Sequence, residues 1–169
     1  MLTHHRLPVC LSLISTDLPI WSAIESAATL YQKDRERFHL LLTEPTLQGD
    51  ILSSATADAS AVADVSNSSP SASPRLLWLE ISPYRAVMTM QHNNRLNYRH
   101  LWEEGVYGFS RYWLREDLMG WNGQMRLRNF TRSLQMTGHP LPHHLRVEYE
   151  LWSEKVQMGR YVLNLEIHH

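Results

Sequence analysis

The best candidate for an acid–base pair in this sequence is a histidine and a glutamate that are four residues apart. His100 and Glu104 would share one face of a helix, where the carboxylate could orient the imidazole for proton transfer. Solvated helix pairs have the same spacing, and the adjacent Glu103 and Glu104 would diverge by about 100° on a helix, so they form no carboxylate dyad. The pattern favours a protein without catalytic activity and leaves an enzyme as the open alternative.

Histidines are the main candidates for metal ligands in this chain. The single cysteine, Cys10, excludes a thiolate zinc site and an internal disulfide within one chain, and its apolar neighbours predict a core residue. His139, His143 and His144 surround a proline turn, where histidines usually face solvent, and no carboxylate is near them in sequence. We therefore predict no metal and no cofactor, and the three turn histidines remain an open question. The chain also lacks a glycine-rich phosphate loop, a nucleophile elbow and a paired CxxC motif.

Arginine and aromatic residues are concentrated between residues 95 and 132. This stretch holds half of the aromatic residues and half of the arginines, and its local charge is +3 in a chain whose net charge is −1. Three interpretations are open: core rings with arginines around them, a protein-binding surface, or a surface on which single-stranded nucleic acid stacks its bases. Four carboxylates within the stretch argue against nucleic acid.

A helical spacing divides this stretch into a buried and an exposed part. Tyr98, Trp102, Val106, Phe109 and Trp113 would fall on one face of a helix, which we expect to pack on a sheet. The candidates for binding a partner are the arginine and aromatic residues outside that stripe, namely Arg111, Tyr112, Arg115, Trp121, Arg126, Arg128 and Arg132.

The N-terminal third predicts a βαβ unit. Residues 7–14 and 38–43 are short apolar runs that indicate strands buried on both faces. Between them, apolar residues recur with a helical period over 17–34, after the capping residues Thr16 and Asp17. Strand, helix and strand in about 40 residues favour a right-handed crossover between parallel strands.

Serine and alanine dominate residues 53–74, which predict a disordered loop because nothing there offsets the entropy of ordering the chain. After it, alternating residues predict a hairpin over 75–91 and another over 144–167, with a bulge at Gly159. Between the hairpins, the apolar spacing favours helices within 97–136, although the glycines at 105 and 108 would also permit a strand over 106–114.

The predicted fold class is therefore α+β, an antiparallel-rich sheet with an N-terminal βαβ unit and two to three covering helices. Residues 1–169 would form a single domain interrupted by the loop at 53–74. The predicted function is that of a non-catalytic cytoplasmic adaptor, assembly or regulatory protein that binds a protein partner. The alternatives are an RNA or single-stranded DNA binding module and a small-ligand or chromophore-binding protein. No apolar run reaches the ~20 residues of a membrane-spanning helix, and the oligomeric state is left open.

Overall fold

Buried and exposed residues alternate with a period of two along the segments of this chain that form its core. The computed structural model describes residues 4–44, 75–91, 96–116 and 121–169. These form ten strands: β1 (His4–Ser15), β2 (Trp21–Gln32), β3 (Phe38–Glu44), β4 (Arg75–Ile81), β5 (Arg85–Gln91), β6 (Leu96–Glu103), β7 (Tyr107–Glu116), β8 (Trp121–Thr137), β9 (His144–Ser153) and β10 (Val156–Ile167). The alternation is the pattern of strands with one face on a core.

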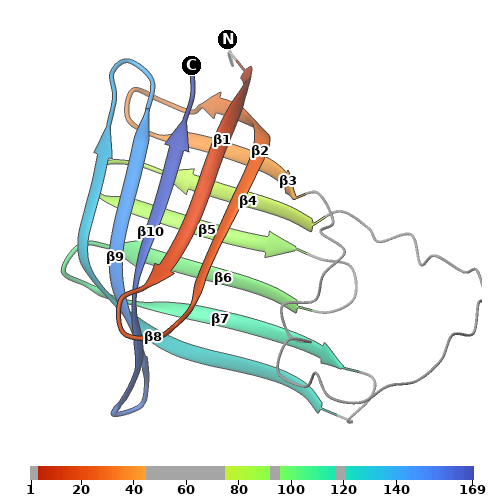
Figure 1. Cartoon of the computed structure of the whole chain (residues 1–169), viewed down its shortest axis with the longest axis vertical. Helices are drawn as coiled ribbons and strands as arrows, with labels where there is room; N and C mark the ends of the chain where they lie inside the picture. The colour runs from red at the N-terminus through yellow and green to blue at the C-terminus, as the bar shows by residue number, and fades with distance from the viewer. Residues whose placement is uncertain (1–3, 45–74, 92–95, 117–120) are drawn as a thin grey trace, which may run out of the picture.

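The ten strands close into an antiparallel barrel. Each strand pairs with the strands before and after it in sequence, and β1 pairs with β10 to complete the ring. Figure 1 shows β3 to β7 running across the picture while β1, β9 and β10 cross them at a steep angle, so the barrel is flattened into two layers. Because the ring is closed, none of these strands presents a free edge to another chain.

The core fills the space between the two layers. Aliphatic side chains such as Leu40 on β3, Leu79 on β4 and Leu165 on β10 are completely buried there. Trp102 on β6 and Phe38 on β3 are among its largest buried side chains. One continuous apolar cluster therefore joins both layers.

The α+β prediction was wrong, because the described residues contain strands and no helix. The helix predicted over 17–34 is replaced by β2, which pairs with β1 from Trp21 to Tyr31. Only Ala28 and Leu30 of β2 are fully buried, so a two-residue period decides which side chains reach the core. The predicted parallel βαβ crossover is accordingly an antiparallel meander of β1, β2 and β3.

The helices predicted within 97–136 are β6, β7 and β8. A tight turn after Glu103 reverses the chain, and Gly105 adopts a positive φ of 73° there, which favours glycine. The helical stripe of aromatic residues is therefore divided between two faces. Trp102 lies in the core, whereas Phe109 and Trp113 are 37% exposed.

Both predicted hairpins are confirmed. The first is β4–β5, whose turn is held by Ser82, and the second is β9–β10, whose register shifts between Gln157 and Gly159 as the bulge prediction requires. The strands predicted over 7–14 and 38–43 are present as β1 and β3. Residues 53–74 lie outside the described residues, and the single-domain organisation remains a prediction. In the described part of the chain, no helix is long and apolar enough to cross a membrane.

Candidate functional site

Three arginines lie side by side on the outer face of the barrel. Arg99 on β6 is the register partner of Arg111 on β7, and Arg111 is the partner of Arg126 on β8. All three side chains are exposed, and strand alternation directs them outward because the neighbouring His100, Ser110 and Leu127 are buried. We call these three residues the arginine row.

The arginine row carries positive charge that no carboxylate in the described part of the chain neutralises at close range. Among the described residues, none of Arg99, Arg111 and Arg126 belongs to an ion pair. Like charges directly opposite each other on neighbouring strands are destabilising by roughly 0.2–1 kcal/mol per pair. The row therefore costs the isolated barrel some stability, which is typical of residues kept for binding.

Aromatic rings lie beside the row on the same face and stack against guanidinium groups. The Cζ atom of Arg126 is 3.6 Å from the centroid of the Phe109 ring, and Cζ of Arg128 is 5.4 Å from that of Tyr107. Such stacking fixes the planes of the guanidinium groups. The edge N–H donors of Arg126 stay available to a partner, whereas Arg128 Nη2 donates to the backbone carbonyl oxygen of Glu154 at 2.7 Å. Tyr107 is 56% exposed, so apolar area is present next to the charge.

A groove continues the arginine row across the neighbouring strands. It has a volume of about 430 Å³ and is lined by Leu41, Leu76, Trp78, Glu80, Thr89, Gln91 and Arg99. Leu41, Trp78, Thr89 and Arg99 are successive register partners from β3 to β6. The groove and the row therefore share one line across the outer face, and Arg99 belongs to both.

The structure brings together some of the residues that the sequence singled out for partner binding and separates others. Arg111, Arg126 and Arg128 gather on the outer face of β7 and β8. Tyr112 lies on the inner face, where its ring packs on His100 at a centroid distance of 5.3 Å, and burial raises its pKa. Arg115 and Trp121 are placed only by their backbone, at opposite positions to Asn122 and Glu116 in the β7–β8 ladder.

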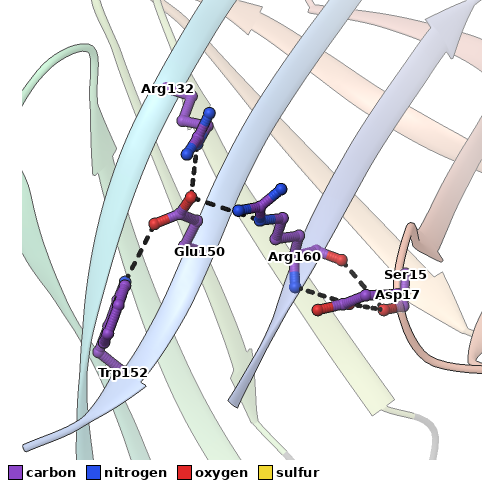
Figure 2. Close-up of polar contacts among 6 residues, drawn as sticks. All are labelled: Ser15, Asp17, Arg132, Glu150, Trp152 and Arg160. Carbon is purple, nitrogen blue, oxygen red and sulfur yellow. Dashed lines mark hydrogen bonds and ion pairs between the residues drawn. The ribbon is translucent and has the colours of Figure 1, made fainter. Parts of the chain in front are cut away.

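Arg132, the remaining predicted residue, is committed to a structural network (Figure 2). Its Nε donates to Oε1 of Glu150 at 2.5 Å, and Arg160 Nε lies 3.6 Å from the same oxygen. Trp152 Nε1 donates to the other carboxylate oxygen at 3.1 Å. The Glu150 side chain is only 6% exposed, so these contacts compensate a buried charge, while the Arg132 side chain itself is 53% exposed.

The same network is anchored to the start of the barrel. Asp17 Oδ1 accepts hydrogen bonds from the backbone N–H of Arg160 at 2.9 Å and from the Ser15 hydroxyl at 2.9 Å (Figure 2). The backbone hydrogen bond from Arg160 is the main reason why the pKa of Asp17 lies below its usual value. These contacts join β1 to β10 where the ring closes.

A second group of polar residues lies inside the barrel. Ser110 Oγ lies 2.6 Å from His100 Nδ1 and accepts a hydrogen bond from Asn129 Nδ2 at 2.9 Å. The His100 ring stacks on Trp102 with 5.1 Å between centroids, and burial lowers the pKa of His100 to about 4. Its imidazole is therefore neutral at pH 7, so one ring nitrogen can donate and the other can accept, and a hydrogen bond joins Nδ1 to the Ser110 hydroxyl.

This serine–histidine pair lacks the access that catalysis requires. Ser110 has no exposed surface and His100 is 5% exposed, so a substrate would not reach the hydroxyl. The proposed acid–base pair of His100 with Glu104 is not formed either, because Glu104 lies exposed in the turn after β6. We therefore assign His100 a structural role in the core.

Three polar atoms next to this cluster have no hydrogen-bond partner within the described residues. They are Trp102 Nε1, Asn129 Oδ1 and Thr131 Oγ1, and all three residues are completely buried.

As for metals, no three His, Cys, Asp or Glu side chains gather in the described ranges. At the β8–β9 turn, the His143 ring packs on His169, and His144 Nε2 lies 3.2 Å from Asn164 Oδ1.

Sequence reasoning missed Arg99 and the groove. The sequence analysis placed Arg99 on a predicted helix, and nothing in the pattern of that helix marked Arg99 as a binding residue. Arg99 lies 12 residues before Arg111 in the sequence, and Arg126 lies 15 residues after it. The three residues become neighbours only because two successive hairpins pair β6 with β7 and β7 with β8. The alternation of side chains along a strand could have found Arg99. Had residues 96–103 and 107–116 been predicted as paired strands, Arg99 and Arg111 would have been placed on one face.

Comparison with solved structures finds a protein of similar fold, and none of the comparisons indicates a function. The chain resembles the crystal structure of ywiB protein from Bacillus subtilis with a TM-score of 0.55, covering 97% of this chain and 94% of that one at 10% sequence identity. At that identity the likeness concerns the fold alone. No protein-family model matches the chain, and neither does any curated protein.

Proposed function

We propose that this chain is a non-catalytic cytoplasmic adaptor, assembly or regulatory protein that binds an acidic protein partner on the outer face of β6, β7 and β8. The observation that carries the proposal is the arginine row, in which three exposed arginines are cross-strand neighbours without an ion pair among the described residues. A partner that brings carboxylates to the row would relieve the repulsion between them and gain charge-assisted hydrogen bonds.

The state of the aromatic rings favours a protein over a nucleic acid. Base stacking requires free ring faces. Here, guanidinium groups lie over Phe109 and Tyr107, and Tyr112 is turned into the barrel. Arginine combined with exposed tyrosine and tryptophan is instead the typical composition of a protein-binding hot spot.

The closed ring also determines how a partner can bind. Strand addition needs a free sheet edge, and among the described residues each strand already has two neighbours. A partner must therefore bind through side chains on the outer face.

The experiment is capture from an extract of the source cell, with and without nuclease treatment, using the full chain as bait. The double variant Arg111→Glu/Arg126→Glu is compared with Arg35→Glu, which reverses an exposed arginine between β2 and β3. We expect one set of acidic proteins to be retained by the wild type and by Arg35→Glu and lost by the double variant. Equal retention by all three baits would refute the site, and loss of the partner on nuclease treatment would point to a nucleic acid.

A second candidate function, binding of a small polar ligand inside the barrel, is favoured by a different observation. The partnerless Trp102 Nε1, Asn129 Oδ1 and Thr131 Oγ1 would be satisfied by a small neutral molecule that both accepts and donates hydrogen bonds and that is enclosed when the chain folds, since all three residues are completely buried. Native mass spectrometry of the protein purified from its source tests this. A bound mass that Thr131→Val releases supports it, and a spectrum with the mass of the chain alone contradicts it.

A further inference from the structure

We infer that the partner presents an α-helix that lies across β4 to β8, with acidic residues one turn apart over the arginine row and a large apolar residue in the groove. This inference rests on the proposed function and names the structural element that would bind. It follows from the spacing of the row, from the line that the row shares with the groove, and from the closed ring of strands.

The spacing of the row matches a helix better than an extended chain. Neighbouring strands are ~4.8 Å apart, so the row presents a positive charge about every 5 Å across the strands. Side chains on one face of a helix recur about every 5.4 Å, whereas those on one face of an extended chain recur about every 6.7 Å. Over the two steps from Arg99 to Arg126 the mismatch is ~1 Å for a helix and ~4 Å for an extended chain.

The groove supplies an apolar seat on the same line. Trp78 lies two strands beyond Arg99 in the register that runs through Thr89. Two strand spacings are ~10 Å, or about two turns of a helix. A helix whose acidic residues meet the row would therefore place an apolar side chain, two turns away, between Leu41, Leu76 and Trp78.

The flattened shape of the barrel lets a straight helix follow this line. Figure 1 shows β3 to β7 side by side in one layer. The groove is itself a depression across β3 to β6 on the outer face of that layer. Glu80 at the groove would pair with a basic residue next to the apolar anchor of the partner.

The test uses two labelled synthetic peptides of identical composition. In the first, three glutamates spaced one turn apart share a helix face with a leucine two turns before them. In the second, the same glutamates occupy alternate positions, as the face of an extended chain would require. Fluorescence anisotropy measures binding to the full chain, and circular dichroism measures the helix content of the bound peptide.

Arginine and groove variants assign the contacts. We expect Arg99→Glu/Arg111→Glu to lower the affinity for the first peptide roughly tenfold. Each exposed ion pair contributes a few-fold to the affinity, and the substitutions turn two of them into repulsive contacts. The matched control Arg35→Glu should bind as the wild type does. Trp78→Ala should weaken binding several-fold, while the same peptide with alanine in place of leucine should be insensitive to Trp78→Ala. Melting curves verify that each variant is folded.

Preferential binding of the first peptide with these sensitivities supports the helix. Equal binding of both peptides, or tighter binding of the second, overturns the helical geometry and leaves an acidic partner in place. If neither peptide binds but capture from the extract still depends on Arg111, the helix is wrong and the proposed function stands. Displacement of the first peptide by oligothymidylate at equal concentration would overturn both in favour of nucleic acid.

Discussion

His100 makes the stability of the barrel depend on pH, and the size of the effect follows from its burial. Burial lowers its pKa from 6.5 to about 4 in the folded protein, whereas the unfolded chain keeps the ordinary value. Below pH 6.5 the unfolded state therefore binds a proton that the folded state does not. The contribution of His100 is fully present above pH 6.5 and is lost as the pH falls through the folded pKa, by about 3 kcal/mol in total at about 1.4 kcal/mol per unit.

The contribution of His100 to the free energy of unfolding can be isolated by urea unfolding of the wild type and of His100→Gln at several pH values between 7.5 and 4. Glutamine does not titrate and can still hydrogen-bond Ser110, so the other ionisable groups are common to both proteins. Asp17 and Asp34, whose pKa values are lowered mainly by backbone hydrogen bonds, contribute a loss at acidic pH that cancels in the difference. The wild type should lose about 3 kcal/mol more than the variant between pH 6.5 and 4. Parallel pH profiles for the two proteins would refute the assignment of a buried, neutral His100.

Three further predictions concern stability, measured by denaturant or thermal unfolding. Arg111→Thr should stabilise the barrel by about 0.5 kcal/mol, because it removes a charge between two like charges on neighbouring strands; a loss of stability would contradict the repulsion. Glu150→Ala should cost about 2 kcal/mol, because it removes a buried carboxylate that accepts two hydrogen bonds and forms an ion pair with Arg160, whereas the more exposed Glu148→Ala should change little. Gly108→Ala should cost about 2–3 kcal/mol, since its Cβ would lie 2.4 Å from a backbone carbonyl oxygen, while Gly105→Ala meets no neighbour and should cost only about 1 kcal/mol for its positive φ.

The sequence was informative where alternation was long and unbroken. In β9, Leu145, Val147 and Tyr149 face the core while the residues between them are less buried, so the strand and its hairpin were predictable. In β2, the residues with a helical period are mostly small or half-exposed, and the core takes only Ala28 and Leu30. The pairing of β2 with β1 and β3 is a tertiary effect that overrides a weak local preference.

The candidate site was predictable in part for the same reason. Composition selected Arg111, Arg126 and Arg128 because arginine and aromatic residues gather in one stretch of chain. Their common face depends on the β7–β8 register, which a helical interpretation cannot supply. The surroundings of Tyr112 and Arg132 also depend on strand register, since Tyr112 packs on His100 of the preceding strand and Arg132 binds Glu150 of the following strand.

Site-specific photo-cross-linking tests the central claim most directly. A photoreactive residue replaces Gln124, which is exposed on the outer face of β8 beside Trp113, and a control replaces the exposed Glu25 on β2. We predict that position 124 cross-links a protein partner in the source cell, that Arg111→Glu abolishes the product, and that position 25 gives none. Cross-linking of nucleic acid at position 124, or the same protein product from both positions, would contradict a protein-binding surface on the arginine row.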